Sequence, residues 1–280
     1  YNPVTGMEEP YPLLNIFSMI AWGLGYFGMP HILLRFMAIE DEKKLSLSRR
    51  VATTWVVISL AVAVLIGVVG LGMTKAGELT LLEGSASETI IVKIADLLST
   101  HGILPALLAG TILAGILAST MSTADSQLLA AASAVSSDLF GGFLKKKETK
   151  SESMKMDRIT LLFIAVIAAF LAKNPDSSVF NIVSFAWAGF GAVFGPVVLF
   201  SLFWKRTNWQ GALAGMITGG AMVFIWKYLV RPMGGILDFY ELLPAFLCSC
   251  IAIVIVSLLT KAPSREITDE FELVQKKMAK

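Results

Sequence analysis

Apolar runs long enough to cross a membrane recur along the 280 residues, and they constrain the fold more than any other feature. A helix needs about 20 predominantly apolar residues to span the hydrocarbon core of a bilayer. None of the runs alternates in the way that a transmembrane β-strand does. We therefore predict an all-α, polytopic membrane helical bundle. The expected spans are residues 11–39, 51–74, 102–139, 159–172, 179–204, 211–226 and 242–260, followed by a tail at 263–280.

The distribution of Lys and Arg predicts how this bundle is oriented. Of the 23 basic side chains, 18 fall in the connections on one side of the predicted spans. The positive-inside rule makes that side cytoplasmic. We therefore expect a cell-membrane protein with its amino end outside and its carboxyl end inside, residues 1–262 forming the transmembrane domain. The five basic residues left on the outer side are Lys75, Lys93, Lys173, Lys227 and Arg231.

The first span contains a predicted break. Three glycines and Pro30 lie within eight residues, at 23–30. Each of them lowers helix stability at one depth of the membrane. Such a break is tolerated where it faces protein or a cavity, and discontinuous helices build the midplane sites of many transporters. Close packing between helices is the alternative, but Trp22 and Tyr26, four residues apart beside the break, favour a binding site for a small ligand.

A polar stripe in the third span is the second candidate site. Ser119, Ser122, Thr123 and Ser126 share one face at helical spacing. Hard cations such as Na+ prefer oxygen ligands, and polar groups at membrane depth are expensive enough to indicate an ion path. The alternative is that each hydroxyl bonds its own i−4 carbonyl. Asp125, on a neighbouring face, is an auxiliary cation ligand, a titrating group or a polar contact with another helix.

Other kinds of function find little support in the residues. His31 and His101 have no second ligand at metal-binding spacing. Phosphate loops, dinucleotide fingerprints and nucleophile–base sets are missing from the sequence. The net charge of +2 reflects the topological bias rather than a nucleic-acid partner. We therefore expect neither an enzyme nor a cofactor, and no metal site beyond Na+. The external segment 85–98 is predicted to form an amphipathic lid.

Three stretches resemble the sodium:solute symporter family, and within it the proline-transporting branch. They read WGLGYFGMPHILLRFMA at 22–38, ILAGILASTMSTADSQLLAAASAVSSDL at 112–139 and SFAWAGFGAVFGPVVLFSLFW at 184–204. The resemblance implies about thirteen spans around a leucine-transporter-like inverted-repeat core with broken helices. This chain would be the carboxyl-terminal part of such a protein, which fits an odd number of spans and an outside start.

The same resemblance implies particular site residues. Ser122 and Thr123 would offer hydroxyls to sodium, and Ser119 its carbonyl. Asp125 and Ser126 remain candidates for the ion path, from the cost of placing them in a membrane. The proline site would be lined by Trp22, Tyr26 and Pro30. A second broken helix, in the missing amino-terminal half of the transporter, would complete both sites.

The function implied is secondary active transport that couples Na+ influx to L-proline uptake. Sodium is then the coupling ion, and the partners are proline or a similar small solute, the lipid bilayer and the missing amino-terminal half. A sodium symporter for a carboxylate, pantothenate or a sugar is the nearest alternative. A symporter-like membrane sensor module is an alternative of another class.

Overall fold

Helices form all the regular structure in the described part of the chain. The computed structural model describes residues 13–135, 150–173 and 178–278, so the ends of two predicted spans (residues 11–12 and 136–139) lie outside it. Five helices are long and apolar enough to cross a membrane, and a bent pair adds a sixth. The prediction of an all-α, polytopic membrane bundle is therefore confirmed. The five are α4 (Leu45–Lys75), α6 (Ile103–Ser133), α8 (Val179–Phe203), α9 (Trp209–Ile225) and α10 (Leu242–Leu259).

The fourth predicted span, at 159–172, falls in α7 (Lys150–Leu171). This helix extends into a charged flank that includes Lys155, Asp157 and Arg158, and it is not among the helices apolar enough to span. The apolar part from Ile159 onward is shorter than the length that a straight crossing needs. A count of seven spans therefore stays a prediction.

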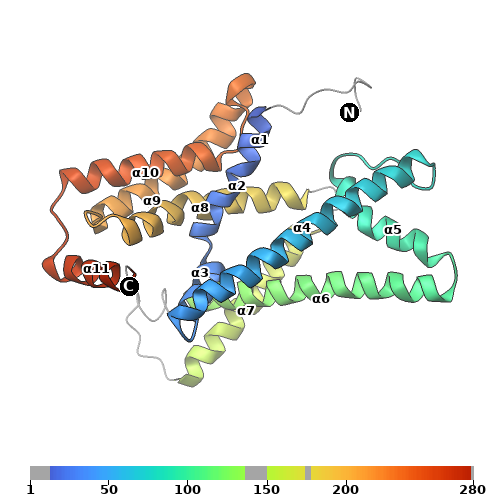
Figure 1. Ribbon diagram of the computed structural model, residues 1–280, viewed down its shortest axis with the longest axis horizontal. Helices are drawn as coiled ribbons and strands as arrows, with labels where there is room; N and C mark the ends of the chain where they lie inside the picture. Colours follow the sequence, from blue (N-terminus) through green and yellow to red (C-terminus); the bar gives the residue numbers. More distant parts are fainter. Residues whose placement is uncertain (1–12, 136–149, 174–177, 279–280) are drawn as a thin grey trace. The chain divides into compact units, whose positions relative to one another are not determined.

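The chain divides into two compact units. The first unit comprises Tyr1–Leu34 and Ile182–Lys280, and the second comprises Arg35–Asn181. Within the first unit, residues from near the start of the chain pack against residues more than 150 positions later. The first unit contains α1 (Leu13–Ile20), α2 (Trp22–Gly25), most of α3 (Pro30–Met37), α8 to α10, and α11 (Arg265–Met278) (Figure 1).

The predicted break in the first span is present. Helix α2 tightens into a 3-10 turn at Tyr26–Gly28, and Met29 is extended with φ −84° and ψ 114°. A residue before proline is disfavoured in the helical region, and proline is well suited to open a helix. Pro30 accordingly begins α3, and the segments on either side of Met29 are bent by 53°.

Helices α9 and α10 lie side by side in the first unit and pack along their length (Figure 1). Gly211, Gly215 and Gly219 are buried at one-turn spacing along α9. A methyl group on any of them would overlap α10 or α8, for example at Ser257 or Ile253. Small residues that let two backbones approach closely are typical of membrane helix pairs. The glycines of this span are therefore packing residues.

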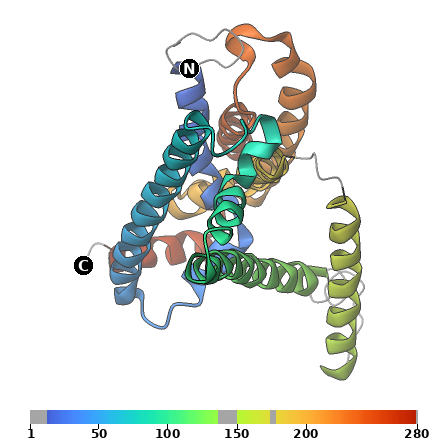
Figure 2. The ribbon, with the colours of Figure 1, turned by 90° about the vertical axis from the view of Figure 1, so that its right-hand side faces the viewer.

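The second unit is built around α5 (Ile90–Ser99), which packs against both α4 and α6 (Figure 2). A 3-10 turn at Gly84–Thr89 precedes α5, so the segment predicted to be an amphipathic lid is helical, with its α-helix starting at Ile90. Gly70 of α4 meets the Ile90 side chain, and Ala95 is buried. Whether this segment acts as a lid stays a prediction.

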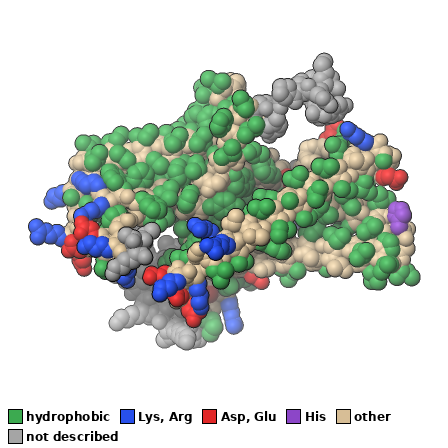
Figure 3. Space-filling model, in the orientation of Figure 1, with side chains coloured by type: hydrophobic (Ala, Val, Ile, Leu, Met, Phe, Trp, Pro, Cys, Tyr) green, Lys and Arg blue, Asp and Glu red, His purple; other side chains and the backbone are tan. Residues whose placement is uncertain are grey.

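Most large apolar side chains of the long helices face outward. Trp55 and Leu65 on α4 are 68 % and 59 % exposed. On the face drawn in Figure 3, hydrophobic side chains cover α9 and α10, and charged ones gather around α11. A soluble domain rarely exposes apolar surface on this scale, whereas lipid tails solvate it without cost.

Candidate functional site

Trp22 lies in an aromatic cluster of the first unit. Its ring stacks with Trp187 of α8 at a centroid distance of 5.5 Å and with Tyr240 at 5.9 Å. The indole N–H of Trp187 donates to the Trp22 carbonyl at 2.9 Å. Aromatic pairs at these distances attract one another beyond their area burial. The side chain predicted to contact substrate is thus held by two rings from distant parts of the chain.

The other predicted substrate residues lie around the break. The Tyr26 ring meets Trp187 edge-on at 4.9 Å and remains 49 % exposed. Pro30 is exposed at the start of α3, whereas Met29 beside it is buried. Trp22, Tyr26 and Pro30 therefore occur on three consecutive short segments, and the first two share Trp187 as a neighbour.

Two of the three glycines of the break, Gly25 and Gly28, serve close packing. A methyl group on Gly25 would overlap the Trp187 indole, and one on Gly28 would overlap the Phe190 carbonyl. From the opposite helix, a methyl group on Gly191 would come within 2.7 Å of the Gly25 Cα. Gly25 and Gly28 therefore pack against α8, as the alternative interpretation of this segment expects, and the aromatic residues gather beside that contact. Whether these aromatic residues bind a ligand stays a prediction.

The predicted sodium residues lie on α6 in the second unit. Ser119, Ser122 and Thr123 are exposed along a helix that runs without interruption from Ile103 to Ser133. Thr123 Oγ1 donates to the Ser119 carbonyl at 3.2 Å, and Ser126 Oγ donates to the Ser122 carbonyl at 3.1 Å. The single helical face predicted for the stripe is thus present, and two of its hydroxyls bond to i−4 carbonyls.

These hydrogen bonds do not prevent ion binding by the stripe. A hydroxyl that donates to an i−4 carbonyl still has lone pairs to offer a cation. Hard cations take about six oxygen ligands, so three or four from one helix leave the rest to other segments. Asp125 is exposed on the neighbouring face of the same helix. In the described part of the chain, no group of three His, Cys, Asp or Glu residues is placed to hold a metal ion.

Two residues of the aromatic cluster were missed by the sequence interpretation. Trp187 stands between Ala186 and Ala188, and small residues of this kind are typical of helix packing rather than of a binding site. Tyr240 had not been singled out, because it lies in a loop 218 positions after Trp22 and nothing in its local sequence connects the two. Only the folded chain brings these rings together.

These features define a multi-pass helical membrane protein with a broken span. The model of the sodium:solute symporter family matches residues 5–219. This match covers most of the chain, which therefore belongs to the sodium:solute symporter family. The family is one of solute carriers rather than enzymes, in agreement with the prediction from the sequence.

The relatives that the chain resembles carry more specific names. It is 43 % identical over 257 residues to a sodium/proline symporter of Salmonella typhimurium, covering 91 % of this chain and 49 % of the relative. It is 41 % identical over 268 residues to the high-affinity proline transporter PutP of Bacillus subtilis, covering 95 % and 54 %. The Escherichia coli sodium/proline symporter is 42 % identical over 259 residues, covering 91 % and 49 %.

The chain spans about half the length of these curated relatives and matches their carboxyl-terminal half. No solved structure matches it. The leucine-transporter-like core implied by the resemblance therefore stays a prediction.

Proposed function

We propose that this chain takes part in the coupled entry of Na+ and L-proline across the cell membrane. The observation that carries the proposal is the similarity over more than nine-tenths of the chain to proteins named sodium/proline symporters. The broken first span, with its aromatic cluster, adds a physical reason. It supplies the kind of discontinuous helix that forms transporter binding sites. No observation favours the other small solutes or a sensor module.

Sodium is assigned to the stripe on α6. In this proposal the hydroxyls of Ser122 and Thr123 and the carbonyl of Ser119 bind the ion, and no other cofactor takes part. The Ser119 carbonyl already accepts a hydrogen bond from Thr123, so both lie at one place on the helix. Asp125 and Ser126 lie within one further turn and belong to the ion path, where a carboxylate lowers the cost of a cation inside the membrane.

Proline is assigned to the break in the first span. Trp22 and Tyr26 offer apolar ring surface to the pyrrolidine ring, and Pro30 begins α3 just after the break beside them. Where a helix is broken, backbone groups lack their i−4 partners and can bind the charged ends of an amino acid. Segments corresponding to the amino-terminal half of the relatives would supply the remaining ligands of both sites.

Coupling follows from thermodynamic linkage. If bound Na+ favours the conformation that binds proline, proline must raise the affinity for Na+ by the same factor. Sodium would thus stabilise an outward-facing form, and closure over both ligands would precede inward release. The basic residues on the expected cytoplasmic side support an external amino end and a cytoplasmic carboxyl end.

The test is uptake of labelled proline into membrane vesicles. The full chain is co-expressed with the amino-terminal half of the Escherichia coli relative, in cells that lack their own proline transporters. Replacing Thr123 by alanine should raise the Na+ concentration for half-maximal uptake about tenfold, the equivalent of one lost ligand. Ser122→Ala should have an effect in the same direction.

Thr120→Ala provides the matched control. Thr120 lies on the same helix outside the stripe, and its hydroxyl donates to the Ile116 carbonyl at 2.9 Å. It therefore makes the same i−4 bond as Thr123, and its loss should leave the Na+ requirement within about twofold. Proline uptake that is indifferent to Na+, or equal effects of the Thr120 and Thr123 substitutions, would contradict the sodium assignment.

A further inference from the structure

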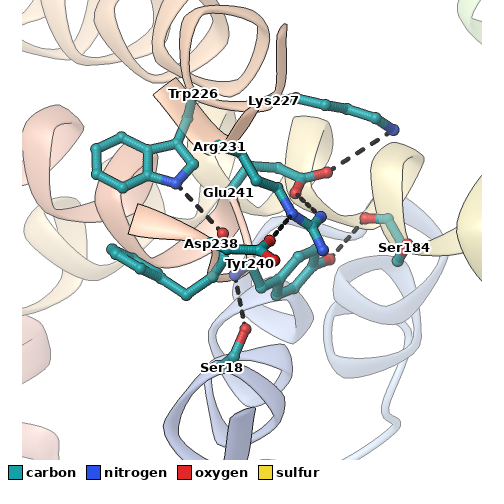
Figure 4. Close-up of polar contacts among 9 residues, drawn as sticks. Ser18, Ser184, Trp226, Lys227, Arg231, Asp238, Tyr240 and Glu241 are labelled. Carbon is teal, nitrogen blue, oxygen red and sulfur yellow. Dashed lines mark hydrogen bonds and ion pairs between the residues drawn. The ribbon is translucent and has the colours of Figure 1, made fainter. Parts of the chain in front are cut away.

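A cluster of charged residues follows α9 in the first unit and has no part in the proposed function (Figure 4). Arg231 Nη1 lies 3.2 Å from Glu241 Oε2, and Arg231 Nε lies 2.8 Å from Asp238 Oδ1. Lys227 Nζ lies 3.9 Å from the other Glu241 oxygen and 3.7 Å from the centre of the Phe185 ring. The Glu241 side chain is only 2 % exposed. A buried carboxylate with two cations beside it is a specific arrangement, because either charge alone would be costly there.

The cluster folds the connection between α9 and α10 back onto the unit. The connection starts with a π-helical turn at Trp226–Val230, and Gly234 and Gly235 both adopt positive φ. Arg231, before the glycines, is tied to Asp238 and Glu241 after them. The Trp226 indole also donates to the Phe239 carbonyl at 3.2 Å. These three contacts and the Lys227–Glu241 ion pair fix a loop whose glycines would otherwise leave it flexible.

Tyr240 lies in this fixed loop and contacts other elements of the first unit (Figure 4). Its backbone N–H donates to Ser18 Oγ of α1 at 2.6 Å, and its hydroxyl donates to the Ser184 carbonyl of α8 at 2.6 Å. Its ring stacks on Trp22. Burial raises the pKa of Tyr240 above its ordinary value, so the hydroxyl remains protonated and able to donate. Tyr240 therefore contacts three elements that carry or support the break.

We propose that Tyr240 is a positioning residue for the substrate site. The ion pairs of Glu241 with Arg231 and Lys227 hold the loop that carries Tyr240, and the Tyr240 ring fixes the Trp22 ring at the break. This inference rests on the proposed function. Without the Tyr240 ring, Trp22 loses one of the stacking contacts described for it and keeps the one with Trp187. Proline binding then becomes weaker, because the Trp22 side chain loses conformational entropy when it is ordered by the bound proline.

The first test observes Trp22 directly, without sodium or proline. The purified full chain is labelled with 5-fluorotryptophan, and Trp22→Phe identifies the Trp22 fluorine signal. Loss of the neighbouring ring in Tyr240→Leu shifts this signal in any case, so the informative result is its shape. We expect it to split or broaden as the ring samples several conformations. A single narrow line would show that Trp22 is fixed without Tyr240 and would overturn the inference.

The second test uses proline uptake in the co-expression system described above. Tyr240→Leu should raise the half-saturating proline concentration at least about fivefold and leave the maximal rate within about twofold. Tyr240→Phe keeps the stacked ring and loses only the bond to Ser184, so it should recover most of the affinity. Tyr228→Leu is the matched control, since this tyrosine lies nearby, is 59 % exposed and stacks on Phe224 rather than on Trp22.

The two tests separate the possible failures. A split Trp22 signal with unchanged half-saturation would overturn the role of Tyr240 in substrate binding. Equal effects of Tyr240→Leu and Tyr228→Leu would overturn it as well. If the unsubstituted protein takes up no proline, the proposed function fails, and the fluorine signal alone still decides whether Tyr240 positions Trp22.

Discussion

Two glycines of α2, only two positions apart, differ in how much space is available for a side chain. Gly25 is buried against the Trp187 indole, whereas Gly23, two positions earlier, has no atom within 4 Å of where a Cβ would lie. Both are helical, and neither has positive φ. They therefore differ in what they touch rather than in backbone conformation.

This contrast predicts opposite effects of the same substitution. Gly25→Ala should lower the free energy of unfolding by about 1–3 kcal/mol, because the added methyl group forces Trp187 to move. Gly23→Ala should raise it by about 0.5–1 kcal/mol, because alanine loses less backbone entropy in a helix. Thermal unfolding of the purified chain in detergent compares the two. Similar shifts in the same direction would contradict the packing of α2 against α8.

The exposed ion pair between Lys205 and Glu272 predicts a pH dependence of the contact between α11 and the end of α8. The hydrogen bond and charge of Lys205 lower the pKa of Glu272 from its ordinary 4.5. A lowered folded-state pKa means that the stabilisation is present above the ordinary value and is lost as pH falls through the folded value. Lys205→Ala should therefore raise the pKa of Glu272 in a carboxyl NMR titration, whereas Lys277→Ala should leave it nearly unchanged.

The hydroxyl stripe shows how far single residues can be predicted from sequence. Helical spacing alone places Ser119, Ser122 and Thr123 on one face, and α6 confirms that placement. Spacing does not reveal which other oxygens approach them, because those belong to distant segments. Tyr240 illustrates the same limit: its contact with Ser18 joins residues 222 positions apart.

Among the elements, α9 and α10 are joined at one end through a single buried side chain. Asn208 caps α9 by accepting from the Gly211 N–H at 2.8 Å. Its amide also donates to Thr260 Oγ1 and to the Lys261 carbonyl, both at 2.7 Å. One residue therefore starts one helix and secures the end of the other.

Substitutions at Asn208 should separate these two contributions. Asn208→Ala removes both and should lower the unfolding free energy by about 2–4 kcal/mol, the sum of a lost cap and of lost buried hydrogen bonds. Asn208→Ser keeps a capping oxygen and removes the amide donor, so its effect should be smaller. Chemical unfolding in mixed micelles measures both. A larger loss with Ser than with Ala would contradict the capping geometry.

The elements that could be predicted are those with a local cause. The break before Pro30 follows from the conformation that proline imposes on Met29, and the helices of the long spans follow from hydropathy. The π-helical turn at Trp226–Val230 had no such signal. Lys227 in this turn and Arg231 just after it contact Glu241, which lies ten or more positions further along the chain, so the contacts around the turn are not local.

At the scale of the whole molecule, the predicted orientation can be tested by labelling. Cys248 and Cys250 are first replaced by serine, so that a single introduced cysteine reports the side of the membrane. Ile236→Cys, in the loop after α9 where Ile236 is 83 % exposed, should react with an impermeant maleimide in intact cells. Lys277→Cys on α11 should react only after the membrane is opened. The reverse pattern would contradict the external amino end.

The first unit combines the start of the chain with segments made much later, and this affects how the protein folds during synthesis. Trp22 and Ser18 leave the ribosome long before their partners Trp187 and Tyr240, which follow 165 and 222 positions later. At ordinary rates of translation this delay is roughly 10 to 45 s. Until α8 has been synthesised, Gly25 and Gly28 of the broken helix lack the Trp187 and Phe190 groups that cover them. We expect the nascent chain to be most accessible to quality-control proteases during this interval.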